Sequence, residues 1–141
     1  MQLMKTSIGL VMSAVLSIGV AFALEPVDPQ PASPLTYSNP AYQKVTPDVA
    51  RMMMAEGVVL IDVRSPEEFA SGHVKGAVNV PLDKFKKGMR LEAVPDVNDK
   101  VLVQCRSGVR AENASKILIE SGYKHVYNAY GTLQWKEPLV K

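Results

Sequence analysis

The sequence predicts an α/β domain with a mostly parallel β-sheet, and two features of its 141 residues support this fold class. Between residues 46 and 128, helical patterns alternate with short apolar runs, as they do in strand–helix–strand units. The runs at 58–63 and 101–103 are nearly continuous rather than alternating, which is typical of parallel strands covered on both faces. A content of 47% apolar and 21% charged residues is ordinary for one globular domain.

The first half of the domain contains two clear helix starts. Thr46 is a predicted N-cap with Pro47 at the first helical position, and this helix extends to residue 56, before Gly57. Further along, Ser65 and Glu68 have the spacing of a capping box. A short second helix is therefore predicted to begin directly after the first apolar strand.

Four further elements are predicted in the second half. They are a short strand at 76–80, an amphipathic basic helix at 82–90, a helix at 111–120 and a short strand at 126–128. The helix at 82–90 carries a row of cations, namely Lys84, Lys86, Lys87 and Arg90. We interpret this row as a solvated helix face and, alternatively, as a patch that steers anionic donors or an acidic partner toward the protein.

The amino terminus has the pattern of an export signal. Lys5 precedes a long, nearly unbroken apolar stretch, and Ala21-Phe22-Ala23 fits a signal-peptidase site. We expect a signal peptide at 1–23, cleaved after Ala23, and a periplasmic protein without stable membrane contact; an uncleaved membrane anchor is the alternative. The proline-rich stretch at 24–43 is predicted to be a linker, either extended or draped over the domain, and the folded domain is predicted at 44–141.

Cys105, the one cysteine of the chain, follows an apolar strand and precedes a small polar loop and a helix. This order places it at the carboxyl end of a strand, where open α/β sheets hold their ligand sites. The loop amides and the positive end of the helix face the sulfur, and Arg106 and Arg110 are cations nearby in the sequence. We therefore expect a reactive Cys105 that is largely ionised at neutral pH, rather than a buried structural cysteine.

Three stretches of the sequence resemble the rhodanese-domain family. They are the segment 62–81, which begins Asp-Val-Arg-Ser-Pro-Glu-Glu-Phe, the Cys-Arg-Ser-Gly-Val-Arg loop at 105–110, and the closing segment 122–131. With its export signal, the chain is most similar to single-domain periplasmic rhodaneses of the phage shock protein E type. The resemblance implies a single rhodanese-like domain whose mostly parallel, five-stranded sheet is flanked by helices. One departure is Tyr130-Gly131, where the family often has two glycines, so a ring is expected near the mouth of the site.

The resemblance implies a thiosulfate sulfurtransferase. Cys105 takes the outer sulfur of thiosulfate as a persulfide, and a thiophilic acceptor such as cyanide or a thiol then removes it, which makes two half-reactions. No metal and no cofactor are implied, and the expected partners are the small donor and acceptor, with a thiol protein as a further candidate. The residues expected to bind the anionic substrate and the persulfide are Arg106, Ser107, Gly108, Val109 and Arg110.

Smaller roles are also expected around this loop. Ser107 is expected to donate a hydrogen bond into the loop, and Arg64 and Glu68 to form a structural ion pair. Because a thiolate needs no separate base, His73 and His125 are expected to be structural or solvent-facing.

Two other functions are weighed against sulfur transfer. Cysteine phosphatases and arsenate reductases need an arginine after five intervening residues, but Ala111 occupies that position and Arg110 comes one residue too early. A sulfur-carrier or thiol-binding module without turnover is the second alternative. A net charge of +2, without a dense basic run, argues against a nucleic-acid partner.

Overall fold

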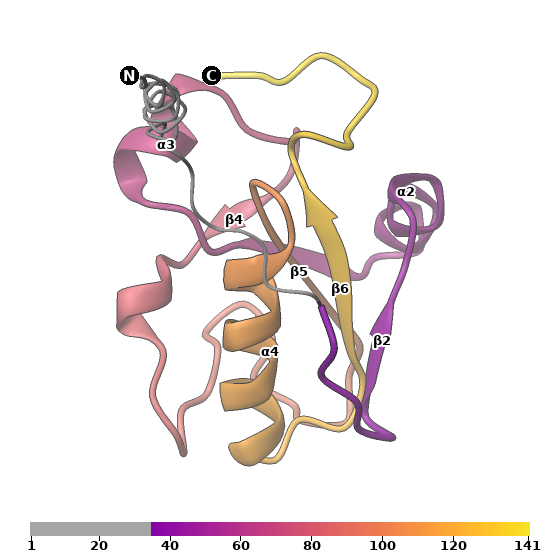
Figure 1. The fold of residues 1–141 in the computed structure, drawn as a ribbon, viewed down its shortest axis with the longest axis vertical. Helices are drawn as coiled ribbons and strands as arrows, with labels where there is room; N and C mark the ends of the chain where they lie inside the picture. The colour runs from indigo at the N-terminus through magenta and orange to yellow at the C-terminus, as the bar shows by residue number, and fades with distance from the viewer. Residues whose placement is uncertain (1–34) are drawn as a thin grey trace, which may run out of the picture. The chain divides into compact units, whose positions relative to one another are not determined.

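The computed structural model describes residues 35–141 (Figure 1). Its centre is a five-stranded sheet in the order β2-β6-β5-β3-β4, and every neighbouring pair is parallel. The strands are β2 (Tyr42–Lys44), β3 (Val59–Asp62), β4 (Val78–Asn79), β5 (Val101–Cys105) and β6 (Val126–Gly131). The predicted α/β class, with five mostly parallel strands, is confirmed.

The helices are α2 (Pro47–Ala55), α3 (Pro66–Ser71), the 3-10 helix η1 (Leu82–Lys84) and α4 (Val109–Glu120). Both predicted helix starts are confirmed. The Thr46 hydroxyl accepts a hydrogen bond from the Val49 N–H, and Ser65 and Glu68 form a reciprocal capping box. The capping box fixes where α3 begins, and it also orients the Glu68 carboxylate, which becomes important at the candidate site.

Two hydrophobic cores form on opposite faces of the sheet because successive strand residues point to opposite sides. On one face, Val103 and Cys105 of β5 pack in the same core as Ala111 and Leu118 of α4. On the other face, Leu102 packs with residues of α2 and of the segment after β6. The Cys105 side chain therefore belongs to the α4 face of the sheet, and Cys105 ends β5 where the chain turns into α4.

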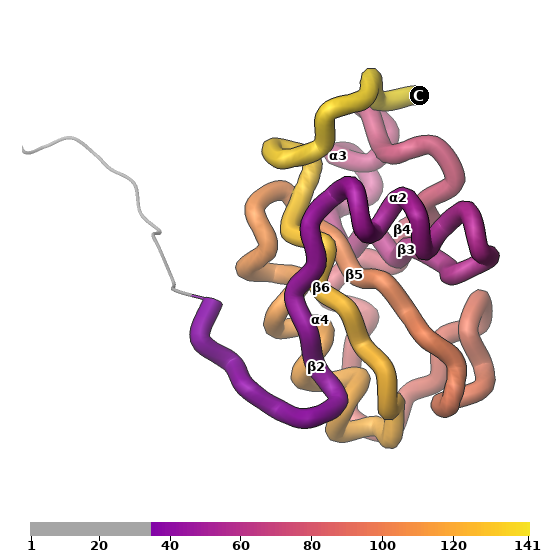
Figure 2. The backbone as a smooth tube through the Cα atoms, turned by 90° about the vertical axis from the view of Figure 1, so that its right-hand side faces the viewer, coloured from indigo at the N-terminus to yellow at the C-terminus, as the bar shows by residue number. Residues whose placement is uncertain are grey.

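The sheet starts two residues before the predicted domain start at Lys44, because β2 includes Tyr42. The Tyr42 ring is buried and packs against the Tyr37 ring at 5.0 Å between centroids. Figure 2 shows segment 35–41 as an indigo tube that bends back before it enters β2. This part of the proline-rich stretch thus packs on the domain, while the predicted signal peptide and residues 24–34 lie outside the described residues.

The predicted helix at 82–90 is wrong. Only the 3-10 turn of η1 forms, and the chain then bends through Gly88, which has a φ of 91°. Phe85 and Leu91 anchor the ends of this bend in the α4-side core. The basic residues remain exposed, and the Arg90 guanidinium donates to the Ser121 carbonyl oxygen at the end of α4, at 2.8 Å. Among residues 35–141, no helix combines the length and hydropathy needed to cross a membrane.

Candidate active site

The loop between β5 and α4 is only three residues long, because Cys105 ends the strand and Val109 starts the helix. The Cys105 side chain is 1% exposed. Its sulfur accepts a hydrogen bond from the Gly108 N–H, with 3.0 Å between the nitrogen and Sγ. The sulfur thus lies at the amino-terminal end of a 12-residue helix, where the helix dipole favours negative charge.

Gly108 has a conformation that suits few other residues. It is the N-cap of α4 with a φ of 117°, a region that L side chains rarely adopt. Its carbonyl oxygen accepts the first helical bond, from the Glu112 N–H at 2.9 Å. Gly108 therefore turns one amide toward the sulfur while its carbonyl begins the helix.

The remaining predicted loop residues differ in their surroundings. Arg106 and Ser107 are exposed, whereas Val109 and Arg110 are half-buried. Within residues 35–141, the Ser107 hydroxyl makes no hydrogen bond, so the expected bond into the loop is not found in the described part of the chain. Arg106 attaches the loop to the segment after β6 through its backbone, because its carbonyl oxygen accepts a hydrogen bond from the Leu133 N–H at 3.1 Å.

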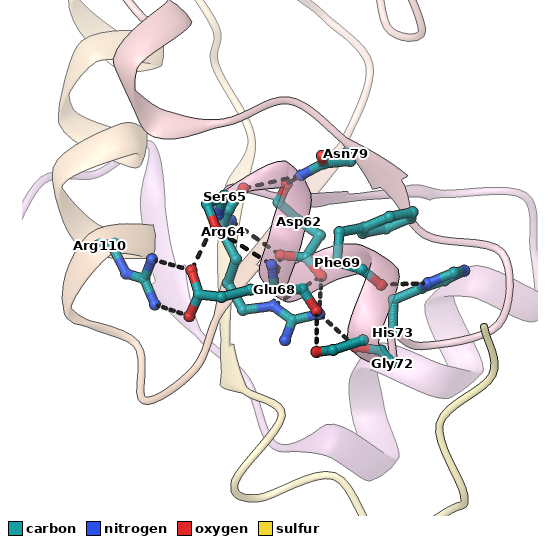
Figure 3. A network of polar contacts seen from close by, with 10 residues as sticks. Asp62, Arg64, Ser65, Glu68, Phe69, Gly72, His73, Asn79 and Arg110 are labelled. Carbon is teal, nitrogen blue, oxygen red and sulfur yellow. Dashed lines mark hydrogen bonds and ion pairs between the residues drawn. The ribbon is translucent and has the colours of Figure 1, made fainter.

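Arg110 forms a bidentate ion pair with Glu68, at 2.7 Å from Nη1 to Oε1 and 3.0 Å from Nη2 to Oε2 (Figure 3). The expected pair between Arg64 and Glu68 is therefore wrong. Hydrogen bonding to the Arg110 guanidinium lowers the pKa of Glu68 to about 2, against the opposing effect of burial. The same bond raises the pKa of Arg110, and the Cys105 charge adds a smaller contribution. The guanidinium is thus fixed at the edge of the site.

Arg64 pairs with Asp62 instead, in a buried cluster next to the site (Figure 3). Arg64 Nη2 lies 2.7 Å from Asp62 Oδ2 and 2.8 Å from the Gly72 carbonyl oxygen. Asn79 Nδ2 donates to the carbonyl oxygens of both Asp62 and Arg64, at 2.9 Å each. These bonds lock the chain between β3 and β4 and so position α3, which carries Glu68.

The loop packs closely against the end of β6. A Cβ atom on Gly131 would lie 2.0 Å from the carbonyl carbon of Arg106, so no side chain fits there. Tyr130, the residue at the departure from the family pattern, has a φ of 63° and is half-buried. Its Cδ1 would be 3.3 Å from a Cβ on Gly108, so the ring does lie against the loop.

A cavity of about 190 Å³ opens beside Arg110. It lies between the start of α3, η1 and the start of α4, and its walls are formed by Val63, Ser65, Pro66, Pro81, Leu82, Asp83 and Arg110. His73 is absent from these walls: its ring stacks on Phe69 at 3.7 Å, and Nδ1 lies 2.9 Å from the Phe69 carbonyl oxygen. The cavity therefore combines apolar side chains with Arg110, Asp83 and Ser65, and no histidine lines it.

Sequence reasoning missed Asn128, which is fully buried in β6 and donates to the Gly108 carbonyl oxygen at 3.0 Å. It also missed the Glu112 carboxylate, which is buried one turn into α4. The signal that was available is polarity, since both residues interrupt the apolar pattern of their elements at buried positions.

The comparisons with known proteins agree with this geometry. Residues 46–137 match the family of rhodanese-like domains. The thiosulfate sulfurtransferase PspE of Escherichia coli K12 is 47% identical over 81 residues, which cover 57% of this chain and 77% of that protein. The thiosulfate sulfurtransferase GlpE of Haemophilus influenzae 86-028NP is 33% identical over 91 residues, with coverages of 64% and 84%.

Solved structures show the same fold. A rhodanese with anions from E. coli superposes with a TM-score of 0.54 and 45% identity, covering 60% of this chain and 99% of that one. The human single-domain sulfurtransferase TSTD1 gives a TM-score of 0.55 and 25% identity, with coverages of 66% and 90%. Because the family match, the fold and the cysteine at the end of β5 all agree, the chain belongs to the rhodanese-like domain family.

Proposed function

We propose that this protein is a thiosulfate sulfurtransferase in which Cys105 carries the transferred sulfur. The Cys105 thiolate attacks the outer sulfur of thiosulfate, the bond between the two thiosulfate sulfurs breaks, and sulfite leaves with the bonding electrons. The persulfide then gives its terminal sulfur to an acceptor such as cyanide, which becomes thiocyanate, and the thiolate is restored. Each half-reaction is a nucleophilic displacement, so ping-pong kinetics are expected.

One observation carries the proposal, namely the 3.0 Å hydrogen bond from the Gly108 N–H to the Cys105 sulfur at the start of α4. An N–H donor and a positive helix end both stabilise a thiolate or a persulfide anion. We assign the same anion-stabilising role to the loop amides around the transferred sulfur, which belong to Arg106, Ser107, Gly108 and Val109. The Arg110 guanidinium is assigned as an anion-binding group.

Loop length favours sulfur transfer over phosphate chemistry. Only three residues separate Cys105 from α4, and Arg110 is held at the edge of the site by Glu68. A tetrahedral oxyanion brings several ligand oxygens and needs a wider ring of donors than one sulfur atom does. We therefore expect no appreciable hydrolysis of an aryl phosphate.

The experiment is intact-mass measurement of the mature protein after thiosulfate, followed by cyanide. We expect a gain of one sulfur atom, its removal by cyanide, and repeated thiocyanate formation. The matched control is Cys105→Ala, which should gain no sulfur. Thiocyanate formation by that variant at the normal rate would contradict the role of Cys105, and a single turnover in the wild type would indicate a sulfur carrier instead.

We further propose that the protein is exported to the periplasm and cleaved after Ala23, with small donors and acceptors, or a thiol protein, as its partners there. Lys5, the apolar stretch and Ala21-Phe22-Ala23 support export. Amino-terminal sequencing of the periplasmic fraction should give Leu24 as the first residue. Full-length chain in the membrane fraction would instead support an uncleaved anchor.

A further inference from the structure

We propose that Asn128 is a positioning residue for the active-site loop, and that it couples the segment Leu35–Tyr42 to the Gly108 amide facing Cys105. Through Asn128, part of the proline-rich stretch before the domain becomes a support of the catalytic loop. The kinetic part of this inference rests on the proposed sulfurtransferase function, whereas its structural part does not.

Asn128 makes three side-chain hydrogen bonds, which use both of its N–H donors and its Oδ1 acceptor. Its Nδ2 group donates to the Gly108 carbonyl oxygen at 3.0 Å and to Tyr42 Oη at 2.9 Å. Its Oδ1 atom accepts from the Tyr130 N–H at 2.8 Å. Because the Gly108 carbonyl is only an acceptor and the Tyr130 N–H only a donor, these partners fix which way the amide faces.

The Tyr42 hydroxyl passes the network on to α4. It accepts from Asn128 and donates to Glu112 Oε1 at 3.0 Å. The pKa of Tyr42 is raised, chiefly by burial, so the hydroxyl stays protonated and available as a donor. Glu112 Oε2 also faces the Tyr37 N–H at 3.4 Å, so segment 35–42 is attached to α4 one turn after the loop.

The segment also contacts the loop directly. A Cβ atom on Gly108 would lie 3.2 Å from Leu35 Cδ1 and 3.3 Å from Tyr130 Cα. Lys44 Nζ donates to the Leu35 carbonyl oxygen at 3.0 Å, which holds this end of the segment near β2. Gly108 is therefore enclosed by Leu35, Tyr130 and Asn128.

This enclosure matters because Gly108 has no side chain to restrict its backbone. Its N–H lies in the peptide plane before it and its carbonyl in the plane after it. Bonds from Asn128 and Glu112 to the carbonyl fix the second plane, and packing from Leu35 and Tyr130 limits the residue itself. The direction of the N–H toward the Cys105 sulfur thus depends on contacts made by β6 and by segment 35–42.

The test compares three variants with the wild type. Asn128→Asp keeps the size and the acceptor for Tyr130, but an aspartate cannot donate to both Gly108 and Tyr42. Tyr42→Phe removes only the hydroxyl. The matched control is Tyr127→Phe, the same substitution at the neighbouring position of β6, which packs in the core on the opposite face of the sheet.

Two readouts are measured on each protein, alongside its thermal midpoint. They are the rate of persulfide formation from saturating thiosulfate and the pH profile of Cys105 alkylation by iodoacetamide. We expect about tenfold slower loading for Asn128→Asp, below the loss of about a hundredfold or more seen when a catalytic donor is deleted outright. Tyr42→Phe should load about threefold more slowly, the effect of one modest hydrogen bond. Both profiles should move to higher pH, and Tyr127→Phe should match the wild type.

The outcomes separate the possibilities. Wild-type loading and an unchanged alkylation profile in a folded Asn128→Asp would overturn the proposal and leave Asn128 a structural residue. If Asn128→Asp does not fold, Tyr42→Phe decides, and a wild-type result there would overturn the coupling to segment 35–42. An equal loss in Tyr127→Phe would also overturn it. Should the wild type take no sulfur from thiosulfate, the proposed function fails, while the alkylation profiles still decide this inference.

Discussion

Two arginine–carboxylate pairs lie side by side at the carboxyl edge of the sheet, and they differ in burial (Figure 3). In the Arg64–Asp62 pair, the side chains are 6% and 0% exposed. In the Arg110–Glu68 pair, they are 35% and 34% exposed. The shortest N–O distance is 2.7 Å in both, so the geometry of the contact does not distinguish them.

The difference in burial gives the two ion pairs different effects on the stability of the fold. A buried charge that loses its partner stays away from water, so each member of the Arg64–Asp62 pair requires the other. A half-exposed charge can be solvated, so the Arg110–Glu68 pair contributes little to stability. Arg110 also lines the cavity between the start of α3, η1 and the start of α4. We infer that the buried pair maintains the fold between β3 and β4, whereas the half-exposed pair acts on substrates.

The largest expected effect comes from breaking the buried pair. Arg64→Met leaves the Asp62 carboxylate buried without a counter-charge and frees the Gly72 carbonyl oxygen. We expect the free energy of unfolding to fall by about 3–5 kcal/mol. Urea denaturation measures this change.

The matched control is Arg51→Met, because Arg51 forms exposed pairs with Asp48 and Glu137. Exposed pairs contribute about 0–1 kcal/mol, so this variant should remain close to the wild type. Equal losses from Arg64→Met and Arg51→Met would remove the distinction by burial.

The next largest expected effect is on thiosulfate binding, when the charges of the Arg110–Glu68 pair are changed. Arg110→Met removes the cation beside the cavity, and we expect about a tenfold rise in the thiosulfate concentration that half-saturates loading, or about 1.4 kcal/mol. Glu68→Gln removes only the negative charge, so it should lower that concentration. Stopped-flow loading rates at two salt concentrations measure both effects. If the two variants shifted half-saturation in the same direction, Arg110 would be acting through the position of α3 instead of through its charge.

The pairing of these charges shows what the sequence could and could not predict. Arg64 and Glu68 are four residues apart, a spacing that favours a pair when both lie on one helix. Here Ser65 caps α3, so Arg64 precedes the helix and turns back to Asp62, while Glu68 faces a residue 42 positions away. The caps Thr46 and Ser65 depend on local sequence, and the sequence predicts both, whereas the choice of ionic partner depends on the tertiary arrangement.

Loop and strand predictions show the same contrast. The strand ending at Cys105 and the helix after it followed from apolar runs and turn residues. The amphipathic pattern over 82–90 predicts a helix, but only one 3-10 turn forms and the chain then bends at Gly88, which has a positive φ. The link from Asn128 to Gly108 joins residues 20 positions apart and required the register of β5 against β6.

The smallest expected effect is the pH dependence of the stability that the Arg110–Glu68 pair contributes. Glu68→Gln retains a side chain suited to the capping box and removes only the charge, so its stability relative to the wild type reports on the ion pair. The pKa of Glu68 is lowered from 4.5 to about 2, chiefly by the hydrogen bond from Arg110. A lowered carboxyl pKa stabilises the folded state above the unfolded-state value, and this contribution disappears as the pH falls through the folded-state value.

The wild type should therefore be more stable than Glu68→Gln near neutral pH, by about 1 kcal/mol or less because solvent screens a pair that is one-third exposed. The difference should shrink as the pH falls from 4.5 toward about 2. Urea unfolding of both proteins across this range measures it. A difference that stayed constant down to about pH 2 would show that the effect of Gln is one of packing, because the ion pair requires an ionised Glu68 and Arg110 remains charged throughout.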